Sequence, residues 1–504
     1  MLGRQTLLIN PPLINGVAFT RQGRCQERDD VLGTTKPPYT LALMAAMLRD
    51  AEMDIRLIDA TAEKLSIEDV IARLDGDGFL PTLIVFPTTT PTLDADVAAV
   101  ARLKAHYSAP MFCFGPHAST APQLSMARAP EVDGMFVGEP EDGLLQLASL
   151  DSTTALGSVP SLTYREAGGP VVPHRAHGSY SGFMSMPYPA WDLVPLRNYA
   201  LPLVDKPYVI IETSRGCPYS CDFCVAPIHQ GHKFRERSAK ILVDEIERTY
   251  REHGIEYYYL WGDTVTLNVK SFSAFCDELI ARKLPIQWFG NARADNLTDP
   301  AFVHRLRRAG CWMLALGIET ESEEVRKDMV KRLESQKIEA AFRNMRAAGI
   351  RSFAFFIFGY PGETMETMQQ TVNYAVRLDP DFANFYPAVP YPGTAMYDKV
   401  VKDGLLPEGA DADWSKMEYS YYLLSGNGLN QRVVMDAINR AKRRFFLRPG
   451  YLARHLGDGT RLAVSKRSIF LQVIRRTLFG AGVVDTGMDP VRTVPAALAE
   501  ADRP

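Results

Sequence analysis

Residues 209–224, with the sequence VIIETSRGCPYSCDFC, decide how the chain is interpreted. A short apolar run typical of a buried strand leads directly into three cysteines spaced C-x3-C-x2-C, at Cys217, Cys221 and Cys224. Three thiolates on one compact loop can hold three irons of a [4Fe–4S] cluster and leave the fourth iron open. A zinc site completed by His229 or His232 is an alternative, although structural zinc favours well-separated cysteine pairs. The loop therefore predicts an iron–sulfur centre with one open coordination position.

Strand-like and helix-like segments alternate on both sides of this loop. Strands are expected at 209–212, 257–261, 288–291, 313–318, 352–358 and 381–386, with helical segments between them. Six such repeats predict a partial (β/α)6 barrel of the TIM type over residues 205–400. The active site of such a barrel lies at the carboxyl ends of its strands.

The first 150 residues alternate in the same way and form a separate predicted domain. Strands are expected at 7–9, 55–59, 83–86, 111–114 and 134–137, and helices at 37–52, 66–74 and 93–107. An α/β fold with an open, doubly wound, Rossmann-like parallel sheet follows, and ligands are expected at the carboxyl ends of its strands. Turn-forming residues gather at 151–204, which is predicted to be a linker with one hairpin.

Composition and charge exclude several classes of protein. The chain has 504 residues, 46% of them hydrophobic, and a net charge of −3, so disorder and nucleic-acid binding are not expected. Its seven cysteines are too few and too clustered for a secreted disulfide scaffold, and Cys25, Cys113, Cys276 and Cys311 are interpreted as buried structural thiols. No apolar stretch reaches the roughly 18 residues of a transmembrane helix. A cytoplasmic protein is therefore expected.

The C-terminal region, residues 401–504, is expected to be helical. Residues 466–479 are predicted to form a basic amphipathic helix, which could lie on a membrane surface or dock on the barrel, and docking is favoured. An aromatic group in the same region could line an apolar substrate pocket or belong to the core, and it consists of Tyr419, Tyr421, Tyr422, Phe445 and Phe446.

The cysteine spacing, with Phe223 just before Cys224, resembles the motif of the radical S-adenosylmethionine (radical SAM) enzymes. In that family the open iron binds the amino and carboxylate groups of SAM, and an electron from the cluster cleaves SAM to a 5′-deoxyadenosyl radical. The resemblance makes Cys217, Cys221 and Cys224 the catalytic and metal-ligating residues. It also implies an electron donor of the flavodoxin or ferredoxin type.

Further segments at the strand ends resemble the SAM-binding segments of the same family. They are 262–264, 291–293, 317–320 and 358–364, and 390–394 matches the P-x-P-G-T segment that ends the sixth strand in related enzymes. With Phe223, the SAM-binding residues that they imply are Asp263, Arg293, Gly317, Glu319, Gly359 and Pro361. Simpler roles stay open: a helix cap for Asp263, a surface ion pair for Arg293, and a tight turn at 358–364.

The N-terminal domain resembles the cobalamin-binding domain found ahead of many radical SAM domains. The cobalamin-binding residues that this implies are Asn10, Pro11, Gly115, His117, Gly138 and Glu139. The D-x-H-x-x-G motif that places a histidine on cobalt is absent, so cobalt is expected without such a ligand, or the domain has lost the cofactor. His117 could touch the corrin or cobalt, or serve as a hydrogen-bonding residue of its loop. Glu139 and Glu141 could cap the next helix or lie near the corrin amides.

These resemblances together imply a cobalamin-dependent radical SAM enzyme with a [4Fe–4S] cluster, SAM and cobalamin. The expected reaction is methylation of an unactivated carbon or phosphorus centre of a small-molecule substrate by way of a 5′-deoxyadenosyl radical and methylcobalamin. The alternatives are a cyclase, oxidase or ring-rearranging enzyme with the same architecture, and, from a different class, a non-catalytic cobalamin or redox sensor.

Overall fold

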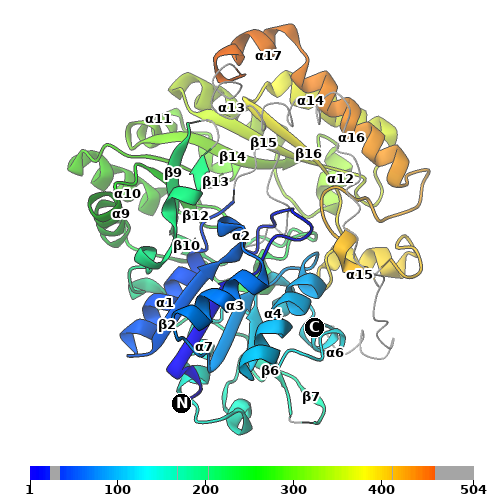
Figure 1. The fold of residues 1–504 in the computed structure, drawn as a ribbon. Coiled ribbons are helices and arrows are strands. Elements are labelled where there is room, and N and C mark those ends of the chain that lie inside the picture. The colour runs from blue at the N-terminus through cyan, green and yellow to red at the C-terminus, as the bar shows by residue number, and fades with distance from the viewer. Residues whose placement is uncertain (23–34, 167, 202–203, 411–412, 460–504) are drawn as a thin grey trace.

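The computed structural model describes residues 1–22, 35–166, 168–201, 204–410 and 413–459, and two seven-stranded sheets organise them. Figure 1 shows the first sheet, in blue and cyan, below the second, which runs from green to yellow. Cys25 and the basic segment 466–479 lie outside the described residues. None of the helices in the described part of the chain is long and apolar enough to cross a membrane.

The first sheet is doubly wound, as predicted, with the strand order β2-β1-β3-β4-β5-β6-β7. Its parallel strands are β1 (Gln5–Asn10), β2 (Asp54–Asp59), β3 (Leu83–Pro87), β4 (Met111–Phe114) and β5 (Gly134–Phe136). Its helices are α1 (Tyr39–Asp50), α2 (Ala60–Glu63), α3 (Ile67–Gly76), α4 (Leu93–Tyr107), α5 (Pro116–Thr120), α6 (Pro122–Arg128) and α7 (Glu141–Ser149). Every residue of β3 is buried, because helices cover both faces of a parallel sheet.

Part of the segment predicted as a linker, residues 151–204, packs against the first sheet. The expected hairpin is present as β6 (Leu162–Arg165) and β7 (Val171–Val172), and it adds two antiparallel strands to the first sheet. Beyond the hairpin the chain runs over α1, where the buried ring of Trp191 lies 6.2 Å from that of Tyr39. The region therefore completes one domain and fixes it to the next.

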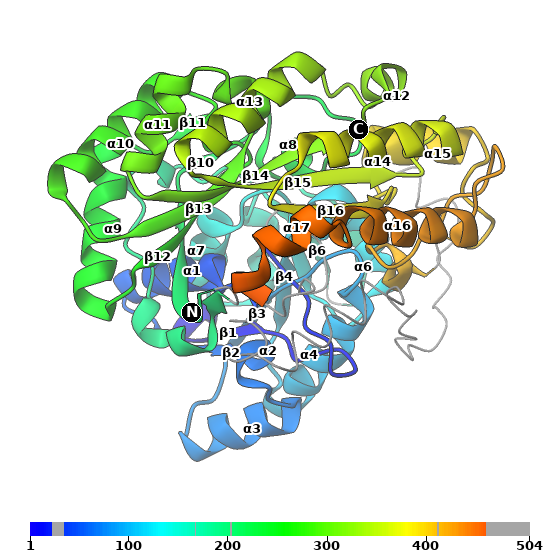
Figure 2. The ribbon, with the colours of Figure 1, turned by 90° about the horizontal axis from the view of Figure 1, so that it is seen from above.

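The second sheet forms the predicted partial barrel. Its parallel strands are β9 (Lys206–Glu212), β12 (Tyr257–Trp261), β13 (Gln287–Ala292), β14 (Cys311–Glu319), β15 (Arg351–Phe358) and β16 (Phe382–Pro387), and β8 (Ala200–Leu201) pairs antiparallel with β9. The helices are α8 (Ala226–Gln230), α9 (Ala239–His253), α10 (Val269–Arg282), α11 (Pro300–Arg308), α12 (Glu323–Asp328), α13 (Ser335–Ala348), α14 (Met365–Leu378), α15 (Ala395–Lys402), α16 (Gln431–Phe446) and α17 (Pro449–Arg454). Figure 2 shows α9, α10, α11 and α13 along the outer side of the curved sheet.

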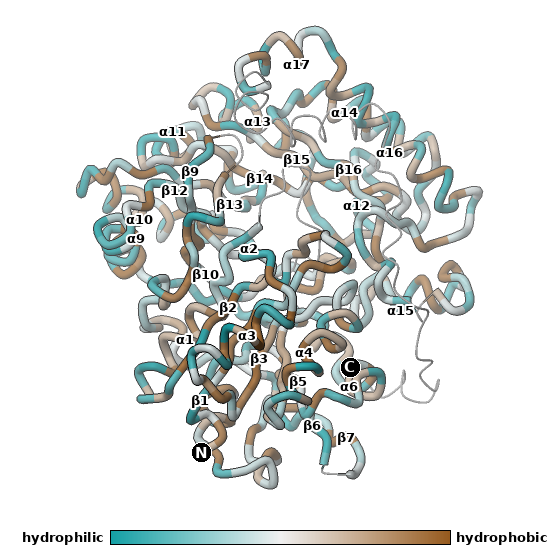
Figure 3. Tube along the Cα trace, in the orientation of Figure 1, coloured by the Kyte–Doolittle hydropathy of each residue, from teal (hydrophilic) through white to brown (hydrophobic). Residues whose placement is uncertain are grey.

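The two faces of the barrel strands differ in burial. Outward side chains are buried against the helices, as Trp288 is against Phe272 and Phe275 of α10. Inward side chains remain partly exposed, so burial alternates strictly along β15 and β16. Figure 3 shows β3 as hydrophobic and the outer helix α9 as mostly hydrophilic, as expected for strands in a core and helices at a surface. The barrel interior is thus partly exposed at β15 and β16, whereas residues 208–212 of β9 are buried on both faces.

A buried ion cluster joins the two sheets where their carboxyl ends meet. Arg215, in the short strand β10 (Ser214–Arg215), contacts Glu139 at 3.0 Å, Glu141 at 2.6 Å and Glu212 at 2.8 Å. Arg235, in β11 (Arg235–Glu236), also pairs with Glu139. Burial opposes the ionisation of Glu139, but the two guanidinium groups outweigh it and hold the pKa of Glu139 below its usual range. Glu139 and Glu141 belong to the first sheet and Glu212 to the barrel, so Arg215 bridges the domains.

The stability of this junction can be tested at Arg215. The substitution Arg215→Met leaves three buried carboxylates without their common cation, so we expect a loss of about 3–5 kcal/mol in the free energy of unfolding. The measurement is the shift of the urea midpoint. The control is Arg49→Met, because the Arg49–Asp192 pair is about half exposed and its loss should cost less than about 1 kcal/mol. Equal shifts for the two variants would contradict the importance of the cluster.

Candidate active site

The cysteine loop lies at the carboxyl end of β9 and is closed by backbone contacts. Gly216 has φ +82°, and a Cβ there would collide with the carbonyl oxygen of Lys233, so only glycine fits. The Cys217 N–H donates to the Gly231 carbonyl at 3.1 Å, which ties the two ends of the loop together. The antiparallel pair β10–β11 joins the two chain segments that flank the loop. The loop is thus held in shape by the protein alone.

The three thiols on this loop differ in exposure. Cys217 is buried, Cys221 and Cys224 are partly exposed, and none forms a disulfide. Among the described residues, no three side chains of His, Cys, Asp or Glu converge on a single metal ion. A structural zinc would require such convergence, whereas a [4Fe–4S] cluster assigns each thiolate to a different iron. The loop therefore fits the cluster better than zinc.

One of the two histidines offered to the zinc alternative, His229, has another partner. The Nδ1 atom of His229 lies 2.9 Å from the Ser119 hydroxyl of α5. Burial lowers the pKa of His229 to about 4, so its imidazole is neutral near pH 7. His229 therefore connects the cysteine loop to the N-terminal domain.

A group of charged residues at the end of β14 lies beside the cysteine loop. Glu319, which has φ +65°, accepts a hydrogen bond from Lys331 at 2.6 Å, and the Lys331 ammonium lies 6.0 Å from the ring of Phe223. Gly317 leaves the space for this pair, because a Cβ there would collide with the Glu319 carboxylate. The register between β14 and β15 shifts between Gly317 and Glu319, which turns the Glu319 side chain out of the strand's regular alternation.

Arg293 belongs to the same group of charged residues beside the cysteine loop. Its guanidinium stacks over Tyr219 of the cysteine loop at 3.9 Å and donates to the Lys331 carbonyl at 2.8 Å. Arg293 also pairs with Asp295 at 3.0 Å, yet it is only 6% exposed, so the surface ion pair that was left open is not what the structure shows. The predicted residues Phe223, Arg293, Gly317 and Glu319 are thus brought together.

Asp263 follows β12, in a turn beyond Gly262. It does not cap α10, because the Asn268 side chain accepts the N–H of Ser271 at that helix start. The Ser214 hydroxyl, buried and without a hydrogen-bond partner, lies against the Gly262 backbone. The turn after β12 therefore presents polar groups next to the cysteine loop.

The turn 358–364 is built around a buried carboxyl group. Glu363 accepts the N–H groups of Gly359 at 2.7 Å and Tyr360 at 3.2 Å, and burial raises its pKa to about 8. Gly359 has φ +76°, and Pro361 lies in the turn between these groups. The Tyr360 hydroxyl donates to Asp222 of the cysteine loop at 2.5 Å. The predicted tight turn is present and is attached to the cysteine loop.

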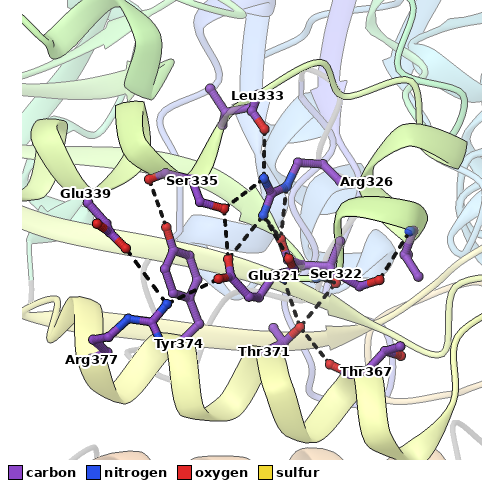
Figure 4. Close-up of polar contacts among 12 residues, drawn as sticks. Glu321, Ser322, Arg326, Leu333, Ser335, Glu339, Thr367, Thr371, Tyr374 and Arg377 are labelled. Atoms are coloured by element: carbon purple, nitrogen blue, oxygen red, sulfur yellow. Dashed lines mark hydrogen bonds and ion pairs between the residues drawn. The ribbon is translucent and has the colours of Figure 1, made fainter.

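The loop that carries Lys331 is held by Arg326 of α12, which the sequence analysis did not single out. The Arg326 guanidinium donates to the carbonyls of Thr320 at 2.9 Å and Leu333 at 2.8 Å, at the two ends of the loop. It also contacts Glu321, which accepts from Arg377 as well. Figure 4 shows this network between α12 and α14. Lone arginines in a helix carry no sequence signature, so only the structure could find it.

The N-terminal strand ends face a small cavity of about 30 Å³ between the two sheets. Gly115 and Glu139 line it from the first sheet, and Glu212 and Trp261 line it from the barrel. Gly115 has φ +129°, and a Cβ there would collide with the Thr88 carbonyl, so the chain passes close to the end of β3. Of the predicted cofactor-binding residues in the described part of the chain, Gly115 and Glu139 are the two that line this cavity.

Other predicted residues at this edge have protein partners. Asn10 donates to Asp59 at 2.9 Å, and the Pro11 carbonyl accepts from Arg21 at 3.2 Å. Gly138 has φ +81° and donates its N–H to Ser119 at 3.0 Å. The contact of these residues and of Glu139 with cobalamin stays a prediction.

His117 is fully buried and both of its ring nitrogens are engaged. Nδ1 lies 3.0 Å from the Thr90 hydroxyl and Nε2 lies 2.9 Å from that of Ser125. The ring also meets Trp414 edge-on at 4.4 Å, and burial lowers the pKa of His117 to about 3. This arrangement favours the hydrogen-bonding role over a bond to cobalt. The buried threonine run 88–90, which supplies one partner, was not singled out from the sequence.

Comparison with known proteins supports this site. The model of the Radical SAM superfamily matches residues 211–375. The chain carries a radical SAM domain. The match contains the cysteine loop and every predicted SAM-binding residue.

Three proteins are similar to this chain over most of its length. An uncharacterised methyltransferase of Pyrococcus horikoshii is 28% identical over 84% of this chain and 91% of its own. The anaerobic magnesium-protoporphyrin IX monomethyl ester cyclase of Cereibacter sphaeroides is 26% identical over 90% of this chain and 74% of its own. The structure of the radical SAM methyltransferase TsrM from Kitasatospora setae, solved with cobalamin and a [4Fe-4S] cluster, superimposes with a TM-score of 0.63 at 19% identity, covering 80% and 78% of the two chains. The fold of both domains is therefore shared.

The buried carboxyl of the radical SAM domain predicts a pH effect. Between the ordinary glutamate pKa and about 8, folded Glu363 keeps a proton that the unfolded chain releases, so the native state loses stability as the pH rises. Glu363→Gln removes this pH-dependent loss of stability. As the pH rises from about 5.5 to about 8, we expect the free energy of unfolding of the variant to increase by about 2–3 kcal/mol relative to that of the parent protein. Urea midpoints at both pH values measure it. Parallel pH profiles would show that Glu363 is ionised in the fold.

The arginine that holds the Lys331 loop predicts an effect on SAM. Arg326→Lys keeps the charge but loses the planar fork that reaches both loop ends, so we expect SAM affinity to fall about tenfold. Equilibrium dialysis with SAM measures it, and the iron content should stay unchanged. The control is Arg377→Lys, because Arg377 is exposed at the outer end of the same network. Unchanged SAM affinity in a folded Arg326→Lys protein would contradict the role.

Proposed function

We propose that the protein is a cobalamin-dependent radical SAM enzyme that methylates an unactivated carbon or phosphorus centre of a small molecule. The observation that carries the proposal is the cavity between the two sheets, which the carboxyl ends of both domains line. A reaction that needs two cofactors and a substrate together requires this kind of shared site. When bound, the cluster and SAM supply a 5′-deoxyadenosyl radical that removes a hydrogen atom, and cobalamin supplies the methyl group.

The residues of the barrel end fit a cluster and SAM. Three soft thiolates suit iron, and the loop that presents them is closed without metal. Around the loop, Glu319 and Lys331 offer one carboxylate and one ammonium. Such a pair can bind the amino and carboxylate groups of an amino acid by exchanging their mutual contact for contacts to the ligand. The unpartnered Ser214 hydroxyl adds a further donor and acceptor.

The residues of the first sheet fit a corrinoid without a histidine ligand. His117 is occupied on both nitrogens, so the corrin would be held by hydrogen bonds at its rim rather than through cobalt. Glu141 offers a buried carboxylate oxygen without a hydrogen-bond partner at the cavity, and such an atom suits an amide N–H donor. Glu139 and Arg215 orient that carboxylate through the ion cluster.

A cyclase or oxidase with the same architecture is the second candidate. The relative from Cereibacter sphaeroides, named as a cyclase, matches 90% of the chain. The two reactions differ in product, because only methyl transfer yields S-adenosylhomocysteine together with 5′-deoxyadenosine. We propose in addition a small flavoprotein or ferredoxin as the electron donor, and a cytoplasmic location. A non-catalytic sensor is disfavoured, because a sensor has no need for the full set of SAM segments.

The experiment is anaerobic reconstitution with iron, sulfide and hydroxocobalamin, followed by metal analysis and a SAM cleavage assay. About four irons and one cobalt per chain are expected. Cys221→Ala should abolish 5′-deoxyadenosine formation, because it removes one of three cluster ligands. The control is Cys276→Ala, since Cys276 is a free, buried thiol of α10. Undiminished SAM cleavage by Cys221→Ala would overturn the cluster assignment, and iron without cobalt would overturn the methyltransferase proposal.

A further inference from the structure

The inner face of the barrel is lined by aromatic side chains. They come from five strands and one loop and comprise Tyr257, Tyr259, Trp261, Phe289, Trp312, Phe353, Phe355, Phe382, Tyr386 and Tyr419. These residues are named here the aromatic lining. Trp261 also lines the cavity between the sheets, so the aromatic lining reaches the side of the barrel that faces Gly115 and Glu139.

One wall of the aromatic lining stands on β12, β13 and the start of β14. The rings of Tyr259 and Phe289 are parallel, with centroids 4.7 Å apart, and Tyr259 meets Trp261 edge-on at 5.3 Å. Phe289 in turn contacts Trp312 at 5.9 Å. The Asn291 amide donates to the Tyr259 hydroxyl at 2.9 Å. This wall is thus a continuous and fixed surface of rings.

The other wall stands on β15 and β16. Phe355 lies 4.7 Å from Phe353 and 6.0 Å from Tyr386, and Tyr386 contacts Tyr419 at 4.3 Å. The Asn384 amide donates to the Tyr386 hydroxyl at 2.5 Å. Each wall therefore has one asparagine amide that fixes a tyrosine.

Between the walls, β14 presents side chains without rings. Its inward positions are Met313, Ala315 and Gly317, all partly exposed. The two aromatic walls are therefore separated by a strip of the sheet without rings. Charged inward side chains of the described strands lie near the strand ends, with Lys206 and Arg351 at one end and Glu212 and Glu319 at the other.

Burial separates this surface from ordinary core packing. On the helix side of the same strands, Trp288, Phe356 and Phe385 are at most 1% exposed. On the inner side, Phe289, Phe353 and Phe355 are only partly buried. Large aromatic side chains that converge in a concave face and remain partly exposed indicate a ligand that covers them. Phe445 and Tyr422, considered with Tyr419 in the sequence, are buried in the core and do not belong to this surface.

We propose that the aromatic lining binds the substrate, and that the substrate is a planar, polycyclic and largely uncharged ring system. Aromatic faces held in fixed orientations favour the flat face of another ring over a flexible alkyl chain, because little conformational entropy is lost and stacking adds to apolar burial. The role as substrate site rests on the proposed function. The binding of a planar ring system to the aromatic lining does not depend on the proposed function.

The experiment is equilibrium dialysis of the full-length, anaerobically reconstituted protein against protoporphyrin IX as the planar probe and oleate as the flexible apolar probe. The proposal expects protoporphyrin IX to bind more tightly than oleate. Phe289→Leu and Phe355→Leu should each weaken protoporphyrin IX binding about three- to tenfold. The control is Phe272→Leu, because Phe272 packs on the helix side against Trp288 and should not change binding. Conserved Soret-region spectra of bound probe in all variants check that one site is measured.

Oleate binding as tight as that of protoporphyrin IX, or equal binding by all three variants, would overturn the proposal. The outcome is independent of catalysis, because SAM cleavage is measured separately on the same preparations. Cleavage without planar-probe binding refutes the substrate class and leaves the proposed function standing. Planar-probe binding without iron or cleavage refutes the proposed function and leaves the binding surface standing.

Discussion

A single buried guanidinium, that of Arg215, holds the two sheets of this protein in one arrangement. Three carboxylates surround it, two from the end of the first sheet and one from β9, and all of them are almost fully shielded from water. Removing charges from water is costly unless they are paired, so neither domain can turn away without exposing unpaired charges. Two residues further along the chain stands Cys217. The same interaction therefore fixes where the cysteine loop lies relative to the N-terminal strand ends.

Around that junction, charged and aromatic side chains occupy different parts of the barrel strands. Charged and hydrogen-bonding groups gather at the carboxyl ends, where Arg293, Glu319 and Lys331 meet the cysteine loop. The interior below is aromatic and contains amides but almost no charge. The loops at the polar end are held by hydrogen bonds from their backbones to Arg326 and to the buried Glu363. A polar ligand and an apolar ligand can thus be bound side by side by one sheet.

Much of this could be predicted from the sequence. The strands of both sheets follow from apolar periodicity, and the cysteine spacing located the site because three thiols so close in sequence have few other uses. The ion cluster could not be predicted, because Glu139 and Arg215 are 76 residues apart and nothing local pairs them. His117 was weighed as a corrin contact, yet its partners Thr90 and Ser125 show it in a hydrogen-bonding role. Trp191 looked like part of a linker, and only tertiary packing reveals it as core.

The backbone contacts that close the cysteine loop matter when the protein is exposed to oxygen. Oxygen destroys exposed iron–sulfur clusters, and Cys221 and Cys224 are partly exposed. Gly216, the Cys217–Gly231 hydrogen bond and the β10–β11 pair constrain the loop through its backbone, and none of these contacts involves a thiolate. The loss of iron from the thiolates would therefore break none of them directly.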